Sequence, residues 1–188
     1  TQYSKWIKPI TDRHSDICYN KVLDFACGRG RIANIFAEKS DHITCCDVNS
    51  SALDYCKERF KNNKCGFEFV ESLTENDEPL SLNFKEESFT FIYSWEAMVH
   101  FKYKWLDFYL KEFYRILKPD SHVMIHHSNL ASYITNDIVK SENWNENLHS
   151  RAMVSSEDVK FIAENHGFSV IEQSYVDWGK CKSLDSIS

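Results

Sequence analysis

Two features of this sequence could bind a nucleoside. The first is a turn with two glycines, Gly28 and Gly30, which follows an apolar run that contains Asp24. Glycine lets the backbone adopt positive φ angles and approach a bound molecule closely. The second is Asp47, 17 residues after Gly30, at the end of another apolar run. A carboxylate there can accept hydrogen bonds from both hydroxyls of a ribose, so the spacing predicts a nucleoside-containing cofactor.

The elements that must position these residues alternate along the chain. Short apolar runs predict seven strands, over residues 22–25, 42–47, 67–70, 89–93, 123–127, 168–176 and 183–187. Residues with helical spacing lie between most of them. This order predicts an α/β fold, a Rossmann-like, mostly parallel seven-stranded sheet with helices on both faces and a C-terminal antiparallel strand pair. The cofactor would then lie at the carboxyl ends of the strands.

Helix boundaries follow from capping residues. The helix after the glycine turn is expected to end near Ser40, and Asn49 or Ser50 is expected to cap the next one. Ser155 or Ser156 would cap the last helix, with Gly167 as its left-handed terminator.

Length and composition suit one globular domain over residues 1–188. Within it, residues 1–19 are expected to form a helical segment that acts as a lid or simply packs on the domain. Residues 130–153 form an irregular segment expected on the acceptor side. The chain has no apolar run of about 18 residues, so no membrane span is expected. The formal net charge of −6 argues against a nucleic-acid partner, because phosphate binding relies on clustered Lys and Arg.

Seven cysteines form an odd set without a Cys-x-x-Cys pair. They are interpreted as small buried side chains in a reducing compartment, which predicts a cytoplasmic protein with no metal site. A zinc site or a disulfide framework is the less favoured interpretation.

Four stretches together resemble the class I S-adenosylmethionine-dependent methyltransferases. They are Val22-Leu23-Asp24-Phe25-Ala26-Cys27-Gly28-Arg29-Gly30-Arg31, Cys45-Cys46-Asp47-Val48-Asn49, Glu87-Ser88-Phe89-Thr90-Phe91-Ile92-Tyr93-Ser94 and Phe113-Tyr114-Arg115-Ile116-Leu117-Lys118-Pro119-Asp120-Ser121. The glycine loop, the entry into the fourth strand and the helix end occur in the family's order and spacing. The resemblance spans residues 21–188 and implies S-adenosylmethionine as cofactor.

The resemblance also implies a set of cofactor-binding residues. The glycine loop would wrap the methionine part, Asp47 would hold the ribose, and Val48 would lie against the adenine. Ser94 and Trp95 would flank the amino-acid end and the sulfonium. The implied cofactor-binding set is Asp24, Phe25, Ala26, Cys27, Gly28, Gly30, Asp47, Val48, Ser72, Ser94 and Trp95.

Two positions depart from the family pattern. Ala26 stands where the family often has its first glycine, and its methyl group is tolerable if the φ angle is negative. Ser72-Leu73 stands where the family often has Gly-Asp, which leaves the contact to the adenine amine without its usual acid. Ser72, Thr74 or Asn76 could replace that acid, and the sequence does not choose among them.

The acceptor is the least constrained part of the prediction. A hydroxyl acceptor needs a general base, and His100 is the first choice, with Glu96 beside it in the sequence. His126, His127 and Arg151 are candidates for binding the acceptor, although neighbours in a strand point to opposite sides. These residues favour O-methylation of a small polar or anionic metabolite. A sugar, a sugar nucleotide or a phosphate-like group is preferred, by analogy with enzymes of surface-polysaccharide biosynthesis.

Two other functions stay open from the sequence. Gly28, Gly30, Ala33 and Asp47 also satisfy a loose dinucleotide pattern, which would suit an NAD-dependent oxidoreductase. A non-catalytic, methyltransferase-like partner subunit would keep the same fold. The sequence does not give the oligomeric state.

Overall fold

The computed structural model describes residues 1–72, 74–75, 78–133, 150–178 and 181–188. They fall into two compact units. The first unit consists of residues 1–95 and 115–124, and the second consists of residues 96–114 and 125–188.

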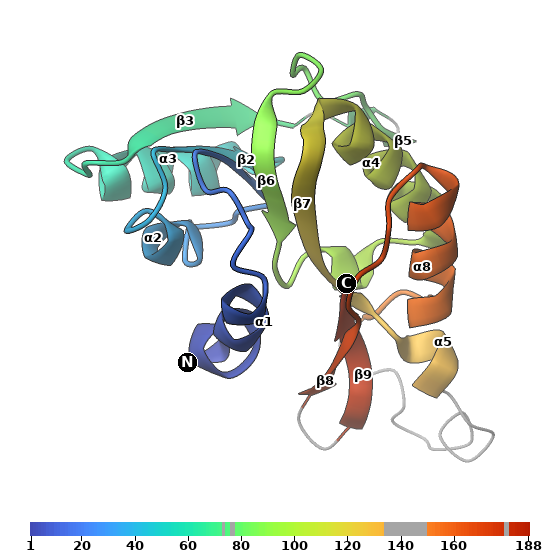
Figure 1. Cartoon of the computed structure of the whole chain (residues 1–188). Helices are drawn as coiled ribbons and strands as arrows, with labels where there is room; N and C mark the ends of the chain where they lie inside the picture. Colours follow the sequence, from blue (N-terminus) through green and yellow to red (C-terminus); the bar gives the residue numbers. More distant parts are fainter. Residues whose placement is uncertain (73, 76–77, 134–149, 179–180) are drawn as a thin grey trace. The chain divides into compact units, whose positions relative to one another are not determined.

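Parallel strands form the centre of the first unit (Figure 1). They are β1 (Lys21–Phe25), β2 (His42–Asp47), β3 (Gly66–Glu71) and β6 (Phe89–Ser94). Both β2 and β6 pair with β1, and β3 pairs with β2. Every residue of β6 is buried, as are the last four of β1, as expected for strands covered on both faces. The four predicted strands are confirmed, and their carboxyl ends meet at one edge.

The first unit also contains helices. They are η1 (Tyr3–Ile7), α1 (Lys8–Arg13), α2 (Ala33–Phe36) and α3 (Ser50–Phe60). Of these, α3 packs against β2 and β3. Asn49 caps α3, as predicted, because its side chain accepts a hydrogen bond from the Ala52 amide. Figure 1 shows α2 and α3 on the same side of β1–β3.

The N-terminal segment is helical, as expected, and it packs on the first unit. Tyr3 and Tyr19 both contact the ring of Phe36, and Ile7 is completely buried. A role as a lid stays a prediction.

One predicted helix is much shorter than expected. The helix after the glycine turn has only the four residues of α2, and residues 29–32 form turns instead. Gly28 and Gly30 both have positive φ angles, which a right-handed helix excludes, so the helix starts late.

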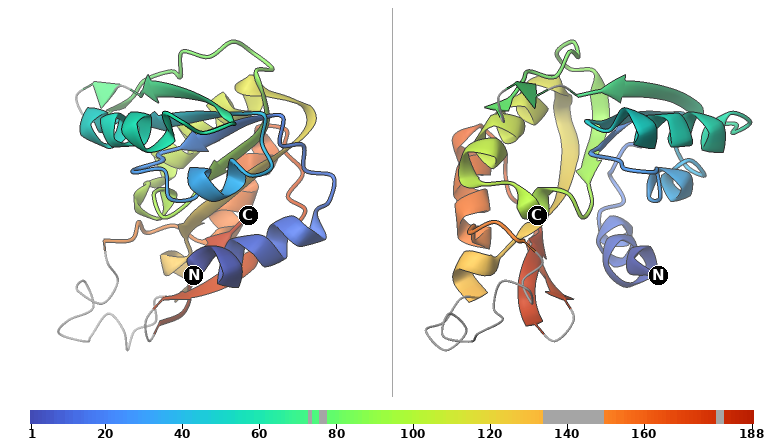
Figure 2. Two further views of the ribbon diagram at one scale, coloured as in Figure 1. Left: turned by 90° about the vertical axis from the view of Figure 1, so that its left-hand side faces the viewer. Right: turned by 180° about the vertical axis from the view of Figure 1, so that it is seen from behind.

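The second unit combines helices with an antiparallel strand pair. Its elements are η2 (Met98–His100), most of α4 (Tyr103–Ile116), α5 (Leu130–Tyr133), α8 (Ser156–Asn165), β8 (Ser174–Trp178) and β9 (Cys181–Ile187). Ser155 caps α8 in a capping box. Its side chain accepts a hydrogen bond from the Asp158 amide, and the Asp158 side chain accepts one from the Ser155 amide. Gly167 ends this helix at φ +99°, as predicted. Figure 2 shows β8 and β9 as a hairpin with the C terminus at the end of β9.

A long strand, β7 (Leu117–Ser128), contributes residues to both units. The strand order of the seven-stranded sheet is β3-β2-β1-β6-β7-β9-β8. In it β9 is antiparallel to both β7 and β8. The predicted sheet, mostly parallel with a C-terminal antiparallel pair, is confirmed.

Several boundaries differ from the prediction. β3 begins at Gly66 rather than residue 67, and β7 begins at Leu117 rather than residue 123. The strand expected over 168–176 begins only at Ser174, because the ladder with β9 does not reach further back. Of the irregular segment 130–153, residues 134–149 lie outside the described residues, as do Leu73 and the 179–180 part of the last turn.

Within the described residues, none of the helices is both long enough and apolar enough to cross a membrane.

Candidate functional site

The glycine loop and Asp47 are joined directly in the first unit. The Gly28 amide donates to one carboxylate oxygen of Asp47 at 2.7 Å, and the Asn49 amide donates to the other at 2.9 Å. The Cys27 amide also donates to the Cys46 carbonyl at 3.1 Å. A carboxylate has about four acceptor positions, so Asp47 keeps capacity for two further donors. The two residues with predicted roles in cofactor binding therefore form one preorganised element.

The two glycines of the loop serve different purposes. Gly28 has φ +52°, and a β-carbon added to it would meet nothing within 4 Å. Gly30 has φ +67°, and a β-carbon there would lie 2.6 Å from the ring of Phe60. Gly30 thus lets the loop pack closely on α3, whereas Gly28 leaves open space that a ligand can fill.

Ala26 does not have the negative φ angle on which its tolerance was predicted to depend. Its φ is +57°, in the left-handed region. An L-residue there places its β-carbon too close to the following carbonyl, at a cost of roughly 1–2 kcal/mol. The loop therefore contains backbone strain at the position where the family often has glycine.

Replacing Ala26 with glycine is expected to stabilise the chain by about 0.5–1 kcal/mol. The strain of roughly 1–2 kcal/mol is removed, while glycine adds about 0.5–1 kcal/mol of unfolded-state entropy. Denaturant unfolding of Ala26→Gly and wild type measures the difference. The matched control is Ala33→Gly, the same change in α2, which should destabilise by about 1 kcal/mol. If both variants lose stability to the same extent, Ala26 is not strained.

Asp24 lies at the end of β1 and is almost completely buried. Burial raises the pKa of Asp24 to about 8, although the hydroxyl of Tyr93 beside it acts in the opposite direction. Within the described residues, its Oδ2 atom has no hydrogen-bond partner. A buried acid with an unsatisfied oxygen suits a polar or cationic ligand group near the loop.

The other residues of the implied cofactor site lie at the ends of β2, β3 and β6. Ser94 is completely buried, and its hydroxyl has no partner among the described residues. Trp95, which follows it, is also buried. Val48 is 57% exposed although apolar, which leaves its face available to a flat apolar group such as adenine. Ser72 is buried beside the Cys46 thiol, and its amide donates to the Asp47 carbonyl at 3.0 Å.

These features fit S-adenosylmethionine. The loop leaves space at Gly28, the Asp47 carboxylate is fixed by two amides, and Asp24 and Ser94 hold unsatisfied polar atoms. Two further residues of the predicted loop, Phe25 and Cys27, lie between Asp24 and Gly28 in the chain.

The candidates for binding the acceptor lie in the second unit. Glu96 has φ +60°, an unfavourable conformation for a non-glycine residue and one that recurs at functional sites. Its amide donates to Nδ1 of His126 at 3.3 Å. Because Nδ1 accepts, neutral His126 carries its proton on Nε2, which lies 3.3 Å from Asp185.

Arg151 has a partner that the sequence did not suggest. Its guanidinium forms two hydrogen bonds to the Asp185 carboxylate, at 2.9 and 2.7 Å, and both side chains are buried. Burial would raise the pKa of Asp185, but the hydrogen bonds and charges of His126 and Arg151 outweigh it and lower the pKa. Arg151 thus neutralises a buried acid, and its predicted role in binding the acceptor stays a prediction.

His127 is a packed residue. Its Nδ1 donates to the Ser128 carbonyl at 2.9 Å, and its Nε2 lies 2.7 Å from the Ser188 hydroxyl. Burial lowers the pKa of His127 to about 4. This histidine is therefore neutral at physiological pH, with both nitrogens engaged inside the second unit.

His100 is exposed at the end of η2. Its Nδ1 lies 3.1 Å from the Ser150 carbonyl, which can only accept, so Nδ1 carries the proton. The neutral ring then presents Nε2 as an acceptor. This is the arrangement that a general base needs.

Asp185 is a functional-site candidate that the sequence pattern does not reveal. It lies in the last strand, where alternation predicts little beyond burial of one face. No local motif links it to Arg151 or to His126, since 34 residues separate the paired Arg151 and Asp185.

Comparison with known proteins indicates the same class of protein as the geometry of the site. A family model described as "Methyltransferase domain" matches residues 22–120, slightly more than half of the chain. The matched range contains the glycine loop, Asp47, β6 and the end of α4. The chain belongs to this family, and it is a class I S-adenosylmethionine-dependent methyltransferase. A search of curated proteins found no significant match.

Solved structures share the fold at low sequence identity. A protein from Pyrococcus horikoshii is 19% identical with a TM-score of 0.72, covering 97% of this chain and 86% of its own. A SAM-dependent methyltransferase from Methanosarcina mazei is 15% identical with a TM-score of 0.70, and the match covers 94% of this chain and 93% of that protein. The cyclopropane synthase MmaA2 of Mycobacterium tuberculosis is 15% identical with a TM-score of 0.68, and the match covers 90% of this chain and 62% of that protein.

These findings decide the cofactor. It is S-adenosylmethionine, not the nicotinamide dinucleotide that the loose glycine pattern also allowed.

Proposed function

We propose that this methyltransferase transfers the methyl group to an oxygen of a small polar or anionic metabolite, such as a sugar, a sugar nucleotide or a phosphate-like group. The observation that carries the proposal is the state of His100. This exposed imidazole has Nδ1 directed at the Ser150 carbonyl, which leaves Nε2 to accept a proton. A hydroxyl acceptor needs such a base.

Each residue has a separate task in this proposal. Asp47 would hold the ribose hydroxyls, Val48 would lie against the adenine, and the Gly28 loop would follow the methionine part. When bound, S-adenosylmethionine supplies a methyl group that its sulfonium makes electrophilic. Nε2 of His100 would take the hydroxyl proton of the acceptor. An anionic oxygen would need only placement, and the protein would then contribute alignment and exclusion of water.

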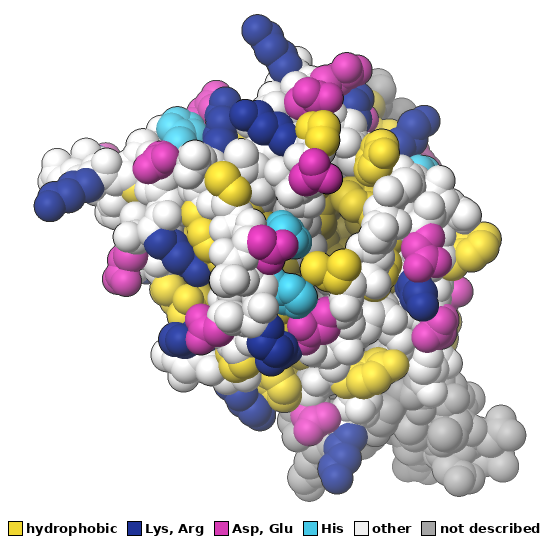
Figure 3. All heavy atoms as spheres, viewed as in Figure 1, with side chains coloured by type: hydrophobic (Ala, Val, Ile, Leu, Met, Phe, Trp, Pro, Cys, Tyr) yellow, Lys and Arg dark blue, Asp and Glu magenta, His cyan; other side chains and the backbone are white. Residues whose placement is uncertain are grey.

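A small-molecule acceptor rather than a nucleic acid is part of the proposal. The formal net charge is −6, and Figure 3 shows acidic and basic side chains interspersed over the face in view. Nucleic-acid binding relies on clustered basic groups. A cytoplasmic location, without membrane attachment, is also proposed. It is supported by six cysteines that are free thiols, namely Cys18, Cys27, Cys45, Cys46, Cys56 and Cys65.

The test incubates the purified chain with labelled S-adenosylmethionine and a panel of sugars, sugar nucleotides and phosphorylated metabolites. We expect an alkali-stable methyl ether, or a methyl ester for an anionic oxygen, identified by NMR of the methyl group. His100→Ala should lower kcat on a hydroxyl acceptor by about 10²–10⁴-fold. His166→Ala, whose ring pairs with Asp107 in the second unit, is the matched control and should stay within about twofold.

Other outcomes would contradict the proposal. A methyl group on carbon, nitrogen or sulfur would assign a different acceptor chemistry. Cofactor binding without transfer to any molecule of a cell extract would instead indicate a non-catalytic partner subunit.

A further inference from the structure

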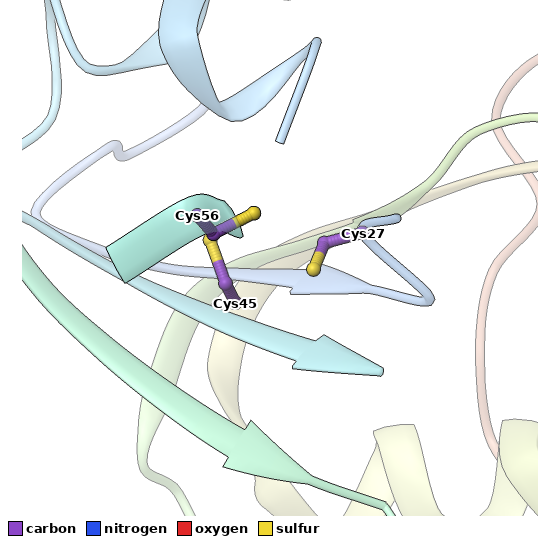
Figure 4. A group of neighbouring side chains, drawn as sticks. All are labelled: Cys27, Cys45 and Cys56. Atoms are coloured by element: carbon purple, nitrogen blue, oxygen red, sulfur yellow. The ribbon is translucent and has the colours of Figure 1, made fainter. Parts of the chain in front are cut away.

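Three cysteines converge next to the glycine loop in the first unit. The Sγ atoms of Cys27, Cys45 and Cys56 all lie within 4.8 Å of one another. Figure 4 shows that they come from the loop after β1, from β2 and from α3, with their sulfur atoms turned toward a common point. Cys45 and Cys56 are completely buried, and Cys27 is half-buried.

The surrounding backbone fixes this cluster. The Cys27 amide donates to the Cys46 carbonyl at 3.1 Å, which ties the loop to β2. The thiols of Cys27 and Cys56 lie 3.4 and 3.3 Å from the Gly28 carbonyl. Gly30 also matters, because a β-carbon there would lie 3.1 Å from Cys56 Sγ. The three thiols are therefore brought together by the same loop that forms the cofactor site.

The spacing suits a metal ion with sulfur ligands. Three thiolates around one zinc at about 2.3 Å lie roughly 4 Å apart, so the cluster needs little adjustment. Thiolate sulfur is a soft ligand that selects zinc, Cu(I) and similar ions over magnesium or calcium. A divalent ion with three thiolates leaves one negative charge. Arg59, one turn after Cys56 on α3, bonds the Arg29 carbonyl at 3.0 Å and places a guanidinium near that charge.

We propose that Cys27, Cys45 and Cys56 form a binding site for a thiophilic divalent metal ion such as Zn²⁺. On binding, each thiol loses its proton to solvent, and each sulfur forms one bond to the metal, with no change of oxidation state. Because Cys27 precedes Gly28, the metal links the glycine loop to β2 and α3. This proposal differs from the interpretation of the cysteines as small buried side chains. It does not depend on the identity of the methyl acceptor.

The test uses Cd²⁺ as a spectroscopic probe of the fully reduced, chelator-treated chain. We expect one Cd²⁺ per chain, with an ultraviolet sulfur-to-metal charge-transfer band whose intensity corresponds to three thiolates. Zn²⁺ should displace it. Cys45→Ala and Cys27→Ser should each weaken binding by at least about tenfold.

Cys46→Ala is the matched control, because Cys46 is the next residue of β2, is equally buried and lies outside the cluster. It should bind Cd²⁺ like wild type. Circular dichroism establishes whether each variant is folded. If Cys45→Ala does not fold, Cys27→Ser still tests the site, because it alters a thiol that is only half-buried. The proposal is overturned if wild type gives no three-thiolate band. It is equally overturned if Cys46→Ala loses the band as well, or if folded Cys27→Ser keeps full affinity.

Discussion

Replacing Asp47 with alanine is expected to weaken binding of S-adenosylhomocysteine by at least about 100-fold. This carboxylate is the proposed acceptor for the two ribose hydroxyls, and a hydrogen bond to a charged group contributes about 1.5–3 kcal/mol. The change also removes the acceptors of the Gly28 and Asn49 amides, at 2.7 and 2.9 Å. The loop then loses the contact that holds it in place, so ordering it when the ligand binds costs additional binding free energy. Isothermal titration calorimetry measures the effect.

Two further variants separate the ribose contact from the loop contact. Asp47→Asn keeps the shape and one acceptor oxygen, so it should bind more weakly than wild type and more tightly than Asp47→Ala. Asp54→Ala removes an exposed acid of α3 that pairs only on the surface with Lys57, and it should bind like wild type. Wild-type affinity of a folded Asp47→Ala protein would place the ribose elsewhere.

The sequence predicted the part of the site that depends on local order along the chain. The glycine loop, Asp47 and the buried strands before them recur in one supersecondary unit, where a strand, a turn and a helix must follow one another. The cap at Asn49 and the terminator at Gly167 are also local, and both predictions are confirmed. Such features need only neighbouring residues to form.

Features that depend on contacts distant in sequence were not predictable in this way. Asp185, Arg151 and His126 meet because β9 pairs with β7, and no spacing in the sequence reports that meeting. The cluster of Cys27 and its two partner thiols likewise needs three elements. Each element contributes one cysteine, and a single cysteine in an apolar pattern resembles an ordinary buried side chain. The sequence therefore favoured packing over metal binding.

The φ angle of Ala26 could not be predicted for a different reason. The residue type alone does not report the φ angle that a turn imposes. The positive φ of +57° follows from the loop path that brings the Gly28 amide to Asp47. Function-bearing loops tolerate such strain when surrounding contacts fix them.

The second large effect concerns the buried ion pair of the second unit. Replacing Arg151 with alanine is expected to lower the free energy of unfolding by about 3–5 kcal/mol, because it leaves the Asp185 carboxylate buried without its cation. Lys57→Ala, which breaks the exposed pair with Asp54, should cost at most about 1 kcal/mol. Replacing both members, as in Arg151→Met with Asp185→Leu, should recover much of the loss, since no charge then remains buried. Chemical denaturation of the three variants and wild type measures these differences.

The pH dependence of this loss tests its electrostatic origin. In wild type the pKa of Asp185 lies below its unfolded value, so its stabilising effect is present above that value and disappears as the pH falls through the folded pKa. Without Arg151 the buried carboxylate has lost a stabilising partner, and its pKa rises. The variant should therefore lose stability relative to wild type progressively as the pH rises through the lowered folded-state pKa of Asp185, which lies below about 4, and it should approach wild type only in more acidic solution. A difference between the two proteins that is constant with pH would instead assign the cost to lost packing of the Arg151 side chain.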